Sequence, residues 1–352
     1  MKRAFCLALF TAVLAGGAWL ARPAMYTLLA AAQQAPAPSA PAPQTGRGGF
    51  GGPIELGPDD KPAFPDPPAG FNLTRDNIPH GELTHVQYDS KTLGMRRRIR
   101  VYTPPGYSAN RKYPVLYLLH GLGWNDLEWT EVRHAEVVID NLLAEGRIQP
   151  MIMVFPNGDS SMTVAQIEAV GGGPWIGRDG RGGPNPEAAG GRGAAPGGGE
   201  RGGAGRAAGG FDSWLTPFEN DLLKDIIPLV ESRYAVYADR DHRALAGLSM
   251  GGGQALNIGL AHPETFAFVG GFSSAPDTKN PPDLVPGPAV PKQLKLLWLA
   301  CGDKDGLIRI SQGVHNYLKE KGVPHVWHVD GNAHDATEWA NNLYLFSQRI
   351  FK

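Results

Sequence analysis

The chain has 352 residues, and its 33 basic and 34 acidic side chains leave a net charge of −1. This balance argues against a basic nucleic-acid-binding protein, and a hydrophobic share of 42% is enough for a full core. Only Cys6 and Cys301 occur, which excludes a disulfide-stapled scaffold and a zinc site built from cysteines.

The N-terminus begins with MKRAFCLALFTAVLAGGAWLA, a positive start followed by an apolar run and small residues. This order predicts a signal peptide over residues 1–32 and a secreted or periplasmic protein. The alternative is an uncleaved membrane anchor, because the apolar run is long for a signal. Residues 33–74 are rich in Pro, Ala and Gly, so we expect a flexible linker there.

Residues 75–352 have the pattern of one folded domain. Two strand-like runs flank Ser90–Gly94 and predict a hairpin. Five apolar runs follow, which are YPVLYLLHG, MIMVFPNGD, HRALAGLSM, KLLWLACGDKD and VPHVWHVDG. Helical patterns such as AEVVIDNLLAEG and PFENDLLKDIIPLVESRY alternate with them. The alternation predicts an α/β fold, a mostly parallel sheet with helices on both faces and ligands at the carboxyl ends of the strands.

One internal segment does not fit this pattern. In residues 171–210, 18 of the 40 residues are Gly, a composition that cannot form a packed element. Arg-Gly repeats can bind RNA, but three acidic residues offset much of the Arg charge in this segment. We therefore expect a disordered surface insertion and no nucleic-acid partner.

The run GLSMG, residues 247–251, matches the G-x-S-x-G pattern of a nucleophile elbow. It stands between an apolar strand and a long helical pattern, as that motif requires. The glycines then leave room for a sharp turn that raises the Ser249 hydroxyl above the sheet. A plain glycine-rich turn for close strand–helix packing is the alternative, but it gives no reason for the serine.

A serine nucleophile needs a base, an acid that orients the base, and donors for the oxyanion. His334 lies in a loop after the last apolar run, whereas other downstream histidines fall in helix or strand patterns. The acid stays open between Asp303 and Asp305. The oxyanion donors are expected to be the N–H of Met250 and an N–H of the loop after His120.

Five stretches of the chain carry a resemblance to a known family. They are YTPPGY, YPVLYLLHGLG, GLSMGGGQALNIGLAHPETFAFVGGFSSAP, LACGDKDGL and GNAHDATEW. Together they resemble the esterase group of α/β hydrolases, and within it the feruloyl esterase modules of bacterial xylanases in carbohydrate esterase family one. The resemblance implies the α/β-hydrolase fold and a Ser-Asp-His triad without cofactor or metal.

Position by position, the resemblance implies Ser249, Asp305 and His334 as the triad, with the N–H groups of Leu122 and Met250 as oxyanion donors. It further implies a feruloyl esterase that releases hydroxycinnamates from plant cell-wall xylan, with a small-molecule or polysaccharide ester as its partner. An acetyl-xylan or other carbohydrate acyl esterase is the alternative, and a non-catalytic carbohydrate-binding protein is a third.

Three tryptophans, Trp124, Trp129 and Trp339, flank the loops that carry these residues. Each could stack on a sugar or an aromatic acid, or pack beneath the loops.

Overall fold

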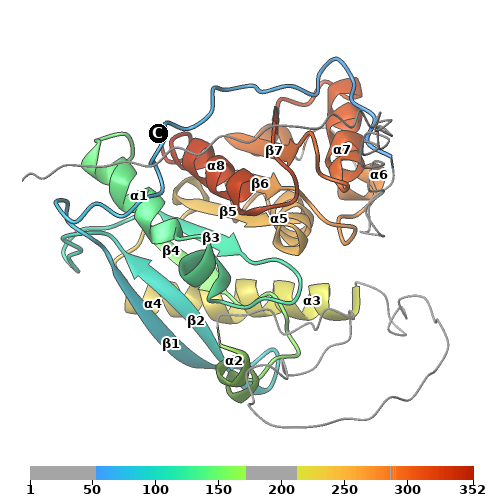
Figure 1. The fold of residues 1–352 in the computed structure, drawn as a ribbon. Helices are drawn as coiled ribbons and strands as arrows, with labels where there is room; N and C mark the ends of the chain where they lie inside the picture. Colours follow the sequence, from blue (N-terminus) through green and yellow to red (C-terminus); the bar gives the residue numbers. More distant parts are fainter. Residues whose placement is uncertain (1–52, 172–211, 286, 288, 290) are drawn as a thin grey trace, which may run out of the picture. The chain divides into compact units, whose positions relative to one another are not determined.

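A computed structural model describes residues 53–171, 212–285, 287, 289 and 291–352, all within one compact unit, Gly48–Lys352. Its centre is an eight-stranded sheet in the order β1-β2-β4-β3-β5-β6-β7-β8 (Figure 1). The strands are β1 (Glu82–Ser90), β2 (Met95–Thr103), β3 (Val115–Leu119), β4 (Ile152–Pro156), β5 (Arg243–Leu248), β6 (Phe268–Phe272), β7 (Leu296–Gly302) and β8 (Val326–Asp330).

The sheet is parallel from β4 to β8, and the β1–β2 hairpin joins it antiparallel at one edge. Every residue of β3, β4, β5 and β6 is buried, as expected of strands that are covered on both faces. β1 instead alternates between buried and exposed residues, which is typical of an edge strand with one solvated face. The predicted α/β class and the predicted hairpin are therefore confirmed.

Helices cover both faces of the sheet (Figure 1). The core on one face includes side chains of α1 and α8, and these two helices contact each other. The core on the other face includes side chains of α3, α4, α5 and α7. The α-helices are α1 (Ala135–Ala144), α2 (Val164–Val170), α3 (Asp212–Asp221), α4 (Ile227–Arg233), α5 (Met250–Ala261), α6 (Pro281–Leu284), α7 (Ile308–Glu320) and α8 (Ala336–Ser347).

Several elements differ from the sequence-based expectation. β6 was not predicted, because its sequence FVGGF contains two adjacent glycines, which weaken a strand pattern. The long helix expected from PFENDLLKDIIPLVESRY is divided by a π-helical turn, Leu222–Ile226, between α3 and α4. Two further short segments, the π-helix η1 (Glu128–Val132) and a 3₁₀ turn before β5, escape prediction as well.

Residues 53–74, which lie within the expected linker, contact the domain at several points. The backbone N–H of Val329 in β8 donates to the Lys61 carbonyl at 3.2 Å. The Ala63 N–H donates to Nδ1 of His328 at 3.1 Å. Composition alone missed these contacts, because they join backbone atoms and a few side chains rather than a patterned apolar face.

The expected signal peptide, the first part of the linker and the insertion beyond Gly171 lie outside the described residues. Across 53–171 and 212–352, apart from three short gaps near residue 288, no helix is both long and apolar enough to cross a membrane.

Replacing Phe64 by Ala tests whether this N-terminal segment stabilises the fold. The Phe64 ring stacks on Trp298 with centroids 5.4 Å apart, and the Arg349 guanidinium lies 3.5 Å from its centroid. The ring is half-buried, so we expect a loss of about 2 kcal/mol, near half the cost of truncating a fully buried ring. That is a fall of about 4–8 °C in the thermal midpoint.

The matched control is Leu73→Ala, at a side chain of the same segment that is 65% exposed. Equal midpoints for the two variants in thermal denaturation would show that residues 53–74 do not stabilise the domain.

Candidate active site

Ser249 lies at the junction of β5 and α5, in a backbone conformation that side chains rarely adopt. Its φ is 52° and its ψ is −117°, so it occupies the positive-φ region without being a glycine. The Ser249 N–H donates to the carbonyl of Phe272 at the end of β6, at 2.9 Å, which anchors the turn to the neighbouring strand. Strain of this kind persists where the surrounding structure holds it, and it is frequent at functional sites.

The glycines around Ser249 are required because backbone atoms approach them closely. A Cβ on Gly247 would lie 2.4 Å from the Gly251 carbonyl oxygen. A Cβ on Gly251 would lie 2.5 Å from the Leu119 carbonyl oxygen at the end of β3. Both glycines of the G-x-S-x-G pattern thus allow α5 to begin directly above the carboxyl ends of β3 and β5.

A chain of hydrogen bonds connects the three residues of the predicted triad. The Ser249 Oγ lies 3.0 Å from His334 Nε2, and His334 Nδ1 lies 2.8 Å from Asp305 Oδ2. An ionised carboxylate only accepts hydrogen bonds, so Nδ1 carries the imidazole proton. Nε2 is then free to accept the hydroxyl proton of Ser249. The structure thus brings together three residues that are separated by up to 85 positions in the sequence.

Asp305 is 1% exposed and is held at both oxygens. The Leu307 N–H donates to Oδ1 at 2.7 Å, and the Cys301 thiol lies 3.4 Å from Oδ2. Burial opposes ionisation, but the interactions with His334, together with the hydrogen bond from the Leu307 N–H, hold the pKa of Asp305 below its usual value. The carboxyl therefore remains ionised and fixes the orientation of the imidazole.

Two other carboxyl groups near the site differ from Asp305. Asp303, the other candidate acid, is 36% exposed in its side chain and pairs with Lys304 at 3.8 Å. Glu338 at the start of α8 is fully buried, and burial together with the charges of Asp330 and Asp305 raises its pKa well above the usual range. Asp305 is thus the carboxylate that faces His334, and no sequence pattern singles out the buried Glu338.

His334 lies in the loop between β8 and α8. Asp335, the next residue, caps α8 by accepting hydrogen bonds from the N–H groups of Thr337 at 2.9 Å and Glu338 at 3.2 Å. The Trp339 ring meets the imidazole edge to face, with centroids 5.1 Å apart and planes at 88°. The capped helix α8 therefore both follows the histidine directly and supplies the indole that packs against its ring.

The two predicted oxyanion donors follow neighbouring strands, Leu122 after β3 and Met250 after β5. Neither N–H is engaged by another residue that the structure describes. The Gly121 N–H is different, because it donates to Oε2 of Glu128 at 2.8 Å. This bond engages the Gly121 N–H, whereas the N–H of Leu122, the donor that the resemblance implies, stays unengaged.

His120 shapes the same loop, and its imidazole makes no hydrogen bond to Ser249, His334 or Asp305. The Gly158 N–H donates to its Nε2 at 2.7 Å, so its Nδ1 carries the proton and donates to the Gly121 carbonyl at 2.8 Å. The imidazole therefore bridges the loop after β3 to the loop after β4.

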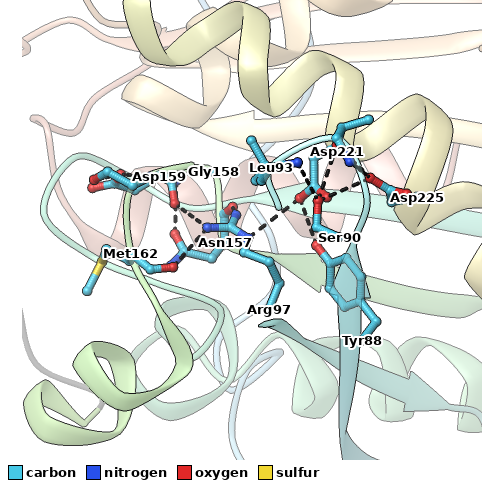
Figure 2. Close-up of polar contacts among 12 residues, drawn as sticks. Tyr88, Ser90, Leu93, Arg97, Asn157, Gly158, Asp159, Met162, Asp221 and Asp225 are labelled. Carbon is cyan, nitrogen blue, oxygen red and sulfur yellow. Dashed lines mark hydrogen bonds and ion pairs between the residues drawn. The ribbon is translucent and has the colours of Figure 1, made fainter. Parts of the chain in front are cut away.

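Arg97 of β2 donates hydrogen bonds to the loop after β4 (Figure 2). Its Nη1 donates to the carbonyls of Asp159 at 2.7 Å and Met162 at 3.1 Å, and its Nη2 donates to that of Asn157 at 2.6 Å. The guanidinium is 1% exposed, and its charge is compensated by Asp221 of α3, 3.6 Å from Nε. A buried ion pair thus ties β2, the β4 loop and α3 together.

The three tryptophans that flank the site have different environments. Trp129 is 1% exposed and donates through its indole N–H to the Leu119 carbonyl, and Trp339 is 6% exposed. Both pack beneath the loops. Trp124 is half-buried and remains the tryptophan of the three that can contact a substrate.

Comparisons with known proteins place the chain in a family. The sequence model of the family described as “Putative esterase” matches residues 90–178 and 195–343. An endo-1,4-beta-xylanase/feruloyl esterase from Xylanibacter ruminicola is 29% identical over 289 residues. The alignment covers 80% of this chain and 33% of the relative, so the chain spans about a third of the length of that protein.

Solved structures show the same fold. A ferulic acid esterase from Anaeromyces mucronatus superposes with a TM-score of 0.61 at 23% identity, covering 81% of this chain and 96% of that one. An S-formylglutathione hydrolase from Staphylococcus aureus gives a TM-score of 0.52 at 17% identity, covering 78% and 98% of the respective chains. The α/β-hydrolase fold predicted from the sequence is thereby confirmed.

Proposed function

The chain belongs to the “Putative esterase” family and is a carboxylic ester hydrolase, and from this premise we propose a serine mechanism with Ser249 as the nucleophile. His334 is the general base and Asp305 orients it. The observation that carries the proposal is the continuous hydrogen-bonded chain from Asp305 through His334 to Ser249, with the strained serine at its end. Nucleophile, base and orienting acid within hydrogen-bond reach are the signature of this chemistry.

In the first half of the reaction, Ser249 Oγ attacks the ester carbonyl carbon while His334 Nε2 takes the hydroxyl proton. The carbonyl oxygen becomes negative, and the N–H groups of Leu122 and Met250 stabilise it. The imidazolium then gives its proton to the leaving alcohol as the carbon–oxygen bond breaks. Asp305 stays ionised throughout and stabilises the imidazolium.

In the second half, water attacks the acyl group on Ser249. His334 takes a proton from the water, and a second tetrahedral intermediate forms in the same oxyanion site. Its collapse releases the carboxylic acid and returns the proton to Oγ. The N-terminus of α5 adds favourable electrostatics at both steps, because its first N–H groups point toward the developing charge.

We propose hydroxycinnamate esters of plant cell-wall xylan as the substrates, and export to the periplasm or the medium as the location. The name of the Xylanibacter relative supports the substrate class, and so does a ferulic acid esterase structure with 26% identity and a TM-score of 0.58. The half-buried Trp124 belongs to the loop after β3 that carries Leu122, the oxyanion loop, and it offers an apolar face for a planar aromatic acid. The predicted signal peptide supports export.

Replacing each of the two candidate acids tests the assignment of the triad. Asp305→Asn would offer an amide to Nδ1 and leave His334 in the wrong tautomer, so we expect a fall in kcat on the order of 10⁴-fold. Asp303→Asn should change kcat by less than about tenfold, because Asp303 does not contact the imidazole. Steady-state kinetics on both variants decides the matter, and the reverse ranking would overturn the assignment.

A comparison of acyl groups tests the substrate class. We expect kcat/KM for methyl ferulate to exceed that for methyl acetate by about tenfold or more, because an aromatic acyl group gains apolar contacts that acetate cannot make. Acetylated xylan and feruloylated arabinoxylan extend the comparison to polymers. Release of acetate from xylan without release of ferulate would replace the feruloyl assignment with the acetyl-xylan alternative. The serine mechanism would survive that result.

A further inference from the structure

The π-helix η1 (Glu128–Val132) follows the oxyanion loop and creates an unusual pairing of side chains. The Arg133 N–H donates to the Glu128 carbonyl at 3.1 Å, the i→i+5 bond that defines this helix type. That spacing brings the side chains of residues 128 and 133 together, and Arg133 Nη2 lies 2.7 Å from Glu128 Oε1. Short π-helical turns are frequent at functional sites.

Glu128 is fully buried and uses its two oxygens for different tasks. Oε1 accepts from Arg133, and Oε2 accepts from the Gly121 N–H at 2.8 Å. The second bond fixes the His120–Gly121 peptide, one peptide before the Gly121–Leu122 unit that carries the proposed oxyanion donor. A buried carboxylate of this kind is stable only with its cation in place, so the position of the oxyanion loop depends on Arg133.

Arg133 also contacts the opposite side of the active site. Its guanidinium carbon lies 4.5 Å from the centroid of Trp339, the ring that meets His334 edge to face. It lies 5.6 Å from the centroid of Trp124, which belongs to the oxyanion loop. The Arg133 side chain is only 11% exposed. Its guanidinium contacts two aromatic rings and forms an ion pair with the Glu128 carboxylate.

We propose that Arg133 is a positioning residue that holds the oxyanion loop and the His334 loop in a common geometry. It acts on the first through Glu128 and Gly121, and on the second through Trp339. The inference rests on the proposed serine mechanism. It adds the residue that aligns the loop of the oxyanion donor with the loop of the general base. A planar guanidinium is required, because it bonds in its plane to a carboxylate and stacks on a ring with its face.

The test compares Arg133→Met and Arg133→Lys with the wild type on methyl ferulate. Loss of alignment affects the transition state more than ground-state binding, so we expect kcat to fall on the order of 10²-fold for Arg133→Met with KM changed less than about threefold. Arg133→Lys restores the charge without the planar fork and should give an intermediate kcat.

Arg100→Met is the matched control. Arg100 of β2 pairs with Glu131 of the same π-helix, and its side chain is 14% exposed, close to that of Arg133. Unlike Arg133, it has no ring contact among the described aromatic residues. Its kcat should stay within about threefold of the wild type, which separates positioning from a general loss of an arginine near η1.

A double variant keeps the test informative if Arg133→Met folds poorly. Glu128→Gln removes the buried charge that Arg133→Met would leave unpaired, so the pair of substitutions should fold. If Arg133 acts on both loops, the double variant should have a lower kcat than Glu128→Gln alone. The decrease should be smaller than the one that Arg133→Met causes in the wild type. Equal kcat for Glu128→Gln and the double variant would show that Arg133 does not act on the His334 loop through Trp339. That result would overturn the proposal.

The outcome is distinguishable from failure of the proposed function. A kcat of Arg133→Met within twofold of the wild type, with Ser249→Ala inactive, would contradict the role of Arg133 alone. A Ser249→Ala variant that keeps wild-type turnover would contradict the serine mechanism itself.

Discussion

The backbone of Ser249 is the constraint on which the rest of the site depends. A serine at a φ of 52° is strained, and such a conformation costs on the order of 1–3 kcal/mol. The turn is held by a hydrogen bond to the end of β6 and by the close approach of β3, β5 and α5 at Gly247 and Gly251. Core packing therefore stabilises the strained turn. The turn presents the Ser249 hydroxyl at the carboxyl end of the sheet.

The other proposed catalytic groups lie at the same carboxyl end of the sheet, because its parallel strands end there together. β3 leads to the oxyanion loop, β7 to Asp305 and β8 to His334, so no single loop carries the chemistry. Loops of this kind need supports of their own. The structure provides a helix cap at Asp335, the buried Arg97 beneath the β4 loop, and the Glu128–Arg133 pair beside Gly121. We infer that alignment of the site rests largely on charged groups outside the triad, of which Arg97 and Glu128 are buried.

Sequence patterns predicted the features that neighbouring residues determine. They left open the contacts between residues that are distant in the chain. The glycines around Ser249 and the loop position of His334 indicated nucleophile and base, because strand, turn and helix signals surround them. The acid stayed open between two carboxylates two positions apart, and only the resemblance favoured Asp305. The pairing of Glu128 with Arg133 depends on a π-helical turn, for which no periodic pattern exists. β6 and the packing of residues 53–74 were missed because glycine- and proline-rich segments resemble loops until their backbone partners are known.

Active-site labelling with a serine-directed phosphonate tests the central claim most directly. The reagent mimics the tetrahedral intermediate and stays covalently bound, so peptide mapping by mass spectrometry identifies the nucleophile. We predict one phosphonylated residue per chain, at Ser249, with loss of esterase activity in proportion to labelling. The His334→Ala variant should label far more slowly, because the hydroxyl lacks its base. Inactivation with the phosphonate on another residue, or full activity in protein labelled at Ser249, would contradict the account.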